Sequence, residues 1–77
     1  MNELLPGCEH LSPPHQKGVI EHVIVIEGTM DVLVNGQWKS LNTGEGLRFL
    51  ADKPHGYRNL ESKISRFYNI IHYSSQL

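Results

Sequence analysis

The chain of 77 residues and 8.8 kDa is long enough for one small domain and too short for two. Its 39% of hydrophobic and 19% of charged residues are typical of a globular chain and argue against a disordered or membrane-embedded one. Seven basic and eight acidic side chains are scattered without runs and leave a net charge of -1, which argues against direct nucleic-acid binding by this chain.

Cys8 is the single cysteine, so an internal disulfide is excluded. The N-terminal residues lack the basic segment and the apolar run of a secretory signal. We therefore expect a cytoplasmic protein.

Residues 1–7, MNELLPG, have the pattern of the end of a strand followed by its turn. Residues 19–26, VIEHVIVI, are β-branched at six of eight positions, which favours a strand over a helix. Alternation along this strand places Glu21 and His22 on opposite faces. Both faces are otherwise aliphatic, so we expect one to line the interior of a barrel and the other to meet a second sheet or a partner subunit, and we favour a homodimer.

A β-hairpin is predicted at residues 29–41, because Asn35 and Gly36 lie between two strand-like runs and both tolerate the positive φ of a type I′ turn. Further strands are predicted at residues 47–50, 55–59 and 64–73. About seven short strands with no helical period predict an all-β sandwich or barrel.

The strand that follows Pro54 carries polar side chains at alternate positions. His55, Tyr57 and Asn59 share one face of it and can line a cavity, whereas Arg58 lies on the other face.

The segment PHQKGVIEHVIVIEG resembles the first sequence motif of the cupins, which are small jelly-roll barrels built as a double-stranded β-helix. His15 and Glu21 match motif positions, and Gly28 follows Glu21 after six residues, as in the family. Lys17 stands where the second histidine of the motif is expected.

The segment GEGLRFLADKPHGYRN resembles the second cupin motif. Gly44, His55 and Asn59 match it, although Leu50 and Asp52 replace its usual proline and glycine. The resemblance covers roughly residues 13–73 and implies an all-β double-stranded β-helix.

More narrowly, HQKGVIEHVIVIEG, LRFLADKPHGYRN and IIHY resemble the C-terminal sensor half of bacterial regulators that join a Cro-repressor-type helix-turn-helix to a cupin. This resemblance implies that residues 1–77 form a single cupin domain, without a DNA-binding domain, that senses a small molecule such as an amino acid or a sulfur compound. It also implies that the barrel lacks its earliest strands, and dimerisation or strand exchange could cover the sheet edge exposed in this way.

The resemblance makes His15, Glu21 and His55 the candidate ligands of one divalent metal ion, for which zinc, nickel, iron and manganese all qualify. Two imidazoles and a carboxylate can occupy one face of such an ion and leave positions open for water or a ligand. The ammonium group of Lys17 repels a metal ion, however, so we expect the pocket to hold a metal weakly or not at all.

The candidate ligand-binding residues are Lys17, Arg48, Tyr57 and Asn59. We expect Lys17 or Arg48 to meet the carboxylate of a small ligand. A simpler alternative stays open for His55, which can cap a turn through its ring nitrogens.

Three functions are compatible with the sequence, and the ligand-sensing domain of a transcriptional regulator has the best support. The alternatives are a stand-alone metal-dependent oxygenase or isomerase, against which Lys17 counts, and a structural dimerisation module. Of the other histidines, we expect His22 at an interface or in the core, His72 in a structural role and His10 in a solvent-exposed loop.

Overall fold

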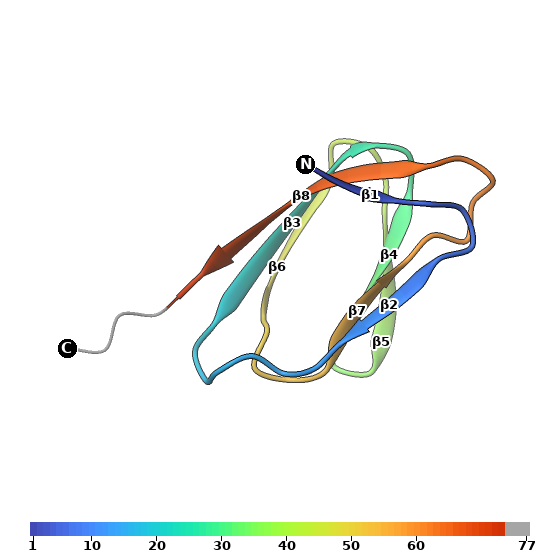
Figure 1. Ribbon diagram of the computed structural model, residues 1–77. Coiled ribbons are helices and arrows are strands. Elements are labelled where there is room, and N and C mark those ends of the chain that lie inside the picture. The colour runs from blue at the N-terminus through green and yellow to red at the C-terminus, as the bar shows by residue number, and fades with distance from the viewer. Residues whose placement is uncertain (74–77) are drawn as a thin grey trace.

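The computed structural model describes residues 1–73, and these form eight strands and no helix. The strands are β1 (Asn2–Leu4), β2 (Glu9–Ser12), β3 (Ile20–Glu27), β4 (Met30–Val34), β5 (Gln37–Leu41), β6 (Gly46–Leu50), β7 (His55–Arg58) and β8 (Ser65–His72). They form two antiparallel sheets of four strands, in the orders β1-β8-β3-β6 and β2-β7-β4-β5. The two sheets are the opposite walls of a barrel (Figure 1). No helix in the described part of the chain is long and apolar enough to cross a membrane.

The hairpin predicted at residues 29–41 is confirmed as β4 and β5, which pair from Met30 opposite Leu41 to Val34 opposite Gln37. Asn35 and Gly36 have φ values of 54° and 75°, the left-handed values that a type I′ turn requires. The strands predicted at 47–50, 55–59 and 64–73 are also confirmed, as β6, β7 and β8, with bounds that differ by one residue.

The sequence does not predict β2, which makes the expected loop around His10 wrong. Residues Glu9–Ser12 pair with β7 along the edge of their sheet, and His10 is an exposed residue of that strand. An edge strand of sequence EHLS has no β-branched residue and no alternation of apolar and polar side chains, so the local signal for a strand is absent.

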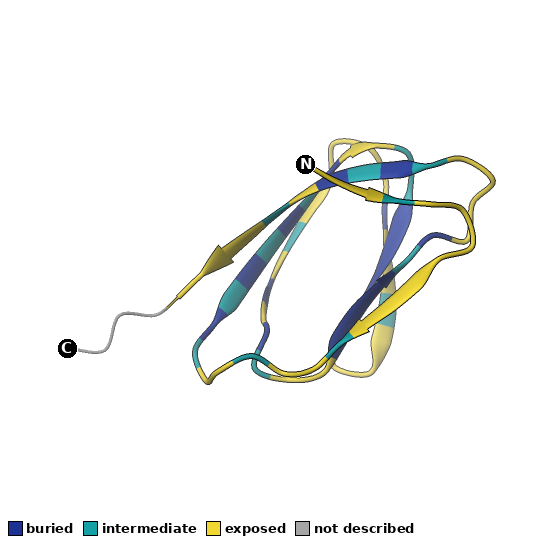
Figure 2. Ribbon diagram, in the orientation of Figure 1, coloured by how far each residue is buried: buried dark blue, intermediate teal, exposed yellow. Residues whose placement is uncertain are grey.

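The alternation predicted for β3 positions the site. Glu21, Val23 and Val25 are buried between the sheets, whereas His22 and Ile24 lie on the outer face and are half-buried (Figure 2). The core between the sheets contains Val19, Val23, Val25, Met30, Val32, Val34, Leu41, Phe49, Ala51, Tyr57 and Phe67. Glu21 therefore enters the barrel among apolar side chains.

The outer face of the sheet β1-β8-β3-β6 has no second layer among the described residues. His22 stands in register with Ile70 of β8 and with Arg48 of β6, so these side chains share this face. Ile70 and Leu50 are 53% and 56% exposed. The sheet thus has one buried face and one exposed face rich in aliphatic residues.

Candidate metal and ligand site

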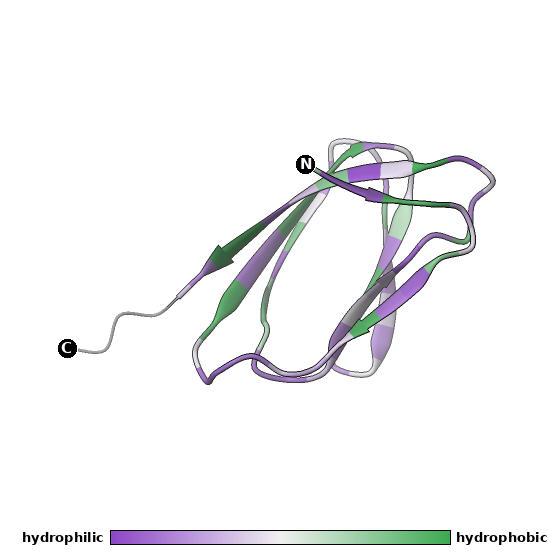
Figure 3. Cartoon of the chain, viewed as in Figure 1, coloured by the Kyte–Doolittle hydropathy of each residue, from purple (hydrophilic) through white to green (hydrophobic). Residues whose placement is uncertain are grey.

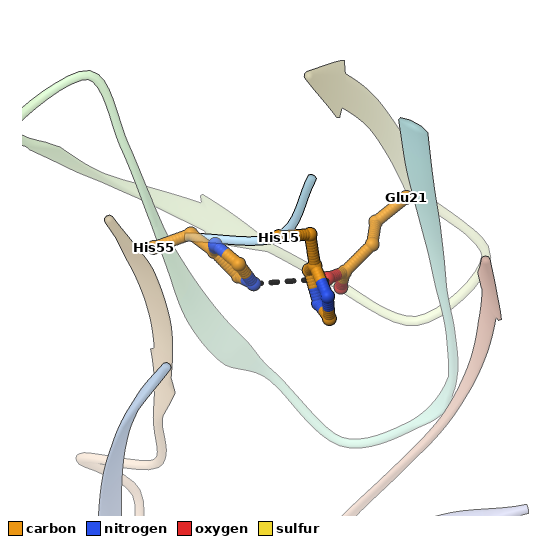
Figure 4. A group of neighbouring side chains, drawn as sticks. All are labelled: His15, Glu21 and His55. Carbon is orange, nitrogen blue, oxygen red and sulfur yellow. Dashed lines mark ion pairs between the residues drawn. The ribbon is translucent and has the colours of Figure 1, made fainter. Parts of the chain in front are cut away.

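The carboxylate of Glu21 lies at the centre of a cluster inside the barrel. Its Oε1 accepts a hydrogen bond from the Tyr57 hydroxyl. Its Oε2 lies 3.0 Å from Nε2 of His15 and 2.9 Å from Nε2 of His55, and Figure 4 shows the three side chains grouped together. Side-chain exposure is 2% for Glu21 and His55 but 33% for His15, so His15 forms the side that is open to solvent.

Three different segments bring these groups together. Glu21 comes from the inner face of β3, and His55 is the first residue of β7, directly after the turn that contains Pro54. His15 lies in the loop between β2 and β3, where its backbone N–H donates to the carbonyl of Ala51 at 2.8 Å. This bond ties the loop to the end of β6, and the rings of His15 and His55 stack with centroids 5.3 Å apart.

The hydrogen bonding of His55 determines which of its nitrogens carries the proton. Its Nδ1 lies 2.9 Å from the carbonyl oxygen of Lys53, and a carbonyl can only accept, so the proton is on Nδ1. In the neutral ring Nε2 then offers a lone pair, and it forms no hydrogen bond although it is buried beside Oε2 of Glu21. Two acceptors at this distance repel each other unless a proton or a metal ion lies at the site.

The donor set fits a divalent metal ion. The ligand atoms of His15, Glu21 and His55 all lie within 4.8 Å of one another. Neighbouring ligands at right angles around an ion with bonds of about 2.1 Å are separated by about 3 Å, close to the two N–O distances found here. The carbonyl of Lys53 on Nδ1 is the kind of outer partner that orients a histidine ligand.

Tyr57 holds the carboxylate from the opposite side. Burial raises the pKa of its phenol well above the usual value, and the negative charge of Glu21 raises this pKa further. The hydroxyl therefore stays protonated and donates to Glu21, while its oxygen accepts from Nδ2 of Asn69 at 3.3 Å. Tyr57 orients Glu21 and leaves Oε2 facing the two histidines.

A cavity of about 390 Å³ opens beside the cluster. It lies between β1, β2 and the inner face of β8, and it is lined by Asn2, Glu3, Leu4, His10, Ser12, His15, Glu21, Tyr57, Phe67, Asn69 and Ile71. His10, Ser12 and Asn69 line the cavity but are not among the site residues predicted from the sequence. Alternation from Phe67 could have indicated Asn69, because both side chains share one face of β8.

The structure brings together His15, Glu21, His55 and Tyr57, but not the other three predicted site residues. Arg48 lies on the outer face of its sheet, in register with His22. Lys17 is exposed in the loop between β2 and β3 and does not line the cavity, so the repulsion of a metal ion expected from its ammonium group does not apply at this site. Asn59 is completely buried, and its amide makes hydrogen bonds to the backbone in place of lining the cavity.

Comparison with known proteins agrees with this architecture. Residues 1–71 match the family Cupin_2, described as a cupin domain. The chain belongs to the cupin family. This cupin is also 49% identical over 71 residues to the HTH-type transcriptional regulator SutR of Escherichia coli (strain K12), a match that covers 92% of the chain and 40% of that regulator.

Two solved structures of regulators are similar to this cupin over 95% of the chain. The Cupin_2 domain of an XRE-family transcriptional regulator from Enterobacter cloacae has 45% identity and a TM-score of 0.92, with 77% of that chain covered. An HTH_3-family transcriptional regulator from Vibrio cholerae has 41% identity and a TM-score of 0.89, with 40% of that chain covered. The predicted fold and the predicted resemblance to helix-turn-helix regulators with a cupin are therefore confirmed, and this cupin spans 40% of the length of the curated relative.

Proposed function

We propose that this chain is the small-molecule-sensing cupin domain of a bacterial transcriptional regulator and that it holds one divalent metal ion. The observation that carries the proposal is the contact between Glu21 and His55, in which a buried carboxylate oxygen faces a ring nitrogen at 2.9 Å. The proton on Nδ1 of His55 leaves the facing Nε2 free to bind a metal ion. His15 completes the three ligands from the open side.

The cavity beside the cluster supports the sensing part of the proposal. It is large enough for a small organic molecule and lies against Glu21 and His15. A bound ion would supply open coordination positions at this wall of the cavity. The similarity to transcriptional regulators supports a role in the cytoplasm, where such a regulator meets DNA.

Metal content tests the site directly. After incubation with zinc, nickel, iron or manganese, protein purified without a metal-affinity tag is expected to retain about one ion per chain. The substitution Glu21→Gln keeps the size of the side chain but removes the charge and one ligand oxygen, so metal content should fall close to zero. Elemental analysis of the desalted protein measures both.

Glu61→Gln is the matched control, because Glu61 is an exposed carboxylate in the loop between β7 and β8. This variant should retain as much metal as the unmodified chain. Equal metal content in Glu21→Gln would refute the site, and a metal-free unmodified chain would refute the metal part of the proposal and leave sensing without a metal.

The proposal includes a homodimer that forms through the outer face of the sheet β1-β8-β3-β6. This face carries the half-buried Ile24 and the exposed Leu50, Tyr68 and Ile70, and apolar surface left in water is costly. The end of β8 is exposed in Figure 2, and Figure 3 shows a hydrophobic stretch there; Ile70, in register with His22, belongs to the outer face, which supports a partner that covers it. A second copy with the same face is the simplest cover, because a two-fold interface pairs a surface with itself.

Ile70→Glu is expected to convert the dimer to a monomer, since two carboxylates would then be buried in one interface. Light scattering at micromolar concentration would measure the change as a halving of the mass. Leu60→Glu is the control, because Leu60 is 67% exposed in the loop after β7 and away from this face, so that variant should stay dimeric. A monomeric unmodified chain would contradict the proposed dimer.

A further inference from the structure

A second cavity, of about 280 Å³, lies between the edges of the two sheets. β6 is the last strand of one sheet and β5 is the last strand of the other, and residues of both strands line this cavity. Its apolar part is formed by Val34, Leu47, Phe49 and Leu50. None of the described residues that line it also lines the cavity beside the metal cluster, so the two cavities are separate.

Three of the seven basic side chains of the protein line this second cavity, namely Lys39, Arg48 and Lys53. Arg58 and Arg66 are held in ion pairs, whereas the three lining cations make no ion pair with any residue that the structure describes. No aspartate or glutamate is among the described residues that line the cavity. The cavity therefore gathers positive charge that the described carboxylates do not neutralise.

Lys39 enters the cavity from the inner face of β5. It stands in register with Val32 of β4, which is completely buried in the core, and directly paired residues of antiparallel strands share one face of their sheet. An inward-pointing charge on an edge strand also discourages pairing with the edge of another chain. That role requires one charge, however, whereas two more cations, from β6 and from the loop after it, line the same cavity.

We infer that this cavity is a second binding site and that its ligand is an organic carboxylate with an apolar body. The carboxylate would lie among Lys39, Arg48 and Lys53, and the apolar body would lie against Leu47 and Phe49. Apolar walls beside fixed cations strengthen the attraction of an anion, because they exclude water from it. The predicted contact of Arg48 with a ligand carboxylate is thereby kept, in a cavity other than the expected one.

The site is compatible with the proposed dimer. Arg48 and Leu50 belong to the outer face of β6, which is part of the proposed interface. Lys39 belongs to the other sheet, and Lys53 belongs to the loop between β6 and β7. Two of the three cations therefore lie away from that interface, and the inference requires neither a dimer nor a metal ion.

Benzoate and benzamide are matched probes, because they share a ring and a carbonyl and differ only in a charged oxygen or an NH₂ group. Benzoate should bind at least about fivefold more tightly than benzamide, since two or more exposed charge pairs each add a modest attraction. Raising the salt concentration to about 0.5 M should shrink this preference, because salt screens exposed charges. Acetate keeps the charge but lacks the apolar body, so it should bind at least about fivefold more weakly than benzoate. NMR chemical-shift titration of the full chain, freed of metal by dialysis, measures these affinities.

Three variants assign the preference to Lys39. Lys39→Gln removes the charge, so it should weaken benzoate binding at least about threefold and leave benzamide binding unchanged. Lys39→Arg keeps the charge and should keep the affinity for benzoate. Lys63→Gln is the matched control, because it removes an exposed lysine in the loop between β7 and β8, outside this cavity. The same spectra show whether each variant is folded.

The location of the shifts separates the two cavities. Benzoate should shift the signals of Leu47 and Phe49, whereas shifts confined to His10 and Ser12 would place it in the other cavity and overturn the inference. Absence of benzoate binding, benzamide that binds as tightly, or equal losses in Lys39→Gln and Lys63→Gln would overturn it as well. None of these results bears on the proposed metal site, which is tested separately by the metal content of Glu21→Gln.

Discussion

Asn59→Ala is expected to lower the free energy of unfolding by about 3–5 kcal/mol, because the buried side chain of Asn59 makes three hydrogen bonds to backbone groups. Nδ2 of Asn59 donates to the carbonyl of Leu4 at 2.9 Å and to that of Lys63 at 2.8 Å. Oδ1 accepts from the backbone N–H of Glu61 at 2.9 Å. The amide thus joins the loop between β7 and β8 to β1.

This loss of stability is large because the backbone groups that bind Asn59 remain in the variant. Alanine would leave two carbonyls and one N–H without their hydrogen bonds, in a place that excludes water from the side chain. Asn59→Asp should be at least as harmful, since a carboxylate would face the two carbonyl oxygens to which the amide now donates. Chemical denaturation followed by circular dichroism measures the change.

Asn42→Ala is the matched control, because Asn42 is exposed and its side chain accepts one hydrogen bond from Thr29. Its cost should stay below about 1 kcal/mol. An Asn59→Ala variant as stable as the Asn42→Ala variant would contradict this structural role and leave the predicted role in ligand binding.

The sequence predicts the central part of the site because strand alternation is a local property. Valines on both sides of Glu21 at alternate positions place that carboxylate inside the barrel, and the structure agrees. His15 and His55 are brought to it by the cupin motifs, whose spacing encodes the pairing of β3 with β6 and the turn before β7. The three candidate metal ligands could therefore be predicted together.

The rest of the site depends on pairings between distant segments, which local patterns do not encode. His10 and Ser12 reach the cavity because a polar segment is paired with β7, and nothing in EHLS favours a strand. The outward position of Arg48 could have been predicted from the alternation of side chains along the strand, because its neighbour Phe49 is buried. The role of Asn59 could not be predicted in full, because the carbonyl of Leu4 to which its amide donates lies 55 residues away along the chain.

Gly28→Ala is expected to lower the free energy of unfolding by about 2–5 kcal/mol, the sum of a strained backbone and a steric overlap. Gly28 has a φ of 84° in the turn between β3 and β4. A Cβ at this position would lie 2.8 Å from the carbonyl oxygen of Ile64 and 3.2 Å from Cα of Ser65. Both atoms belong to the backbone and cannot move without displacing the start of β8.

Gly44→Ala separates the cost of the strained backbone from the cost of the steric overlap. Gly44 has a nearly equal φ of 87°, but a Cβ there would meet nothing within 4 Å. Its substitution should therefore cost about 1–2 kcal/mol from the backbone alone. Denaturant titration of both variants gives the difference, which measures the steric overlap at Gly28.

The position of β8 also matters for function, because Phe67 and Asn69 of this strand line the cavity. The β3–β4 turn contacts the start of that strand, where the Ser65 hydroxyl donates to the carbonyl of Thr29 at 2.6 Å. Gly28→Ala should therefore shift the NMR signals of β8, whereas Gly44→Ala should leave these signals unchanged. Equal destabilisation by the two substitutions, with β8 unaffected, would mean that Gly28 is required only for its positive φ.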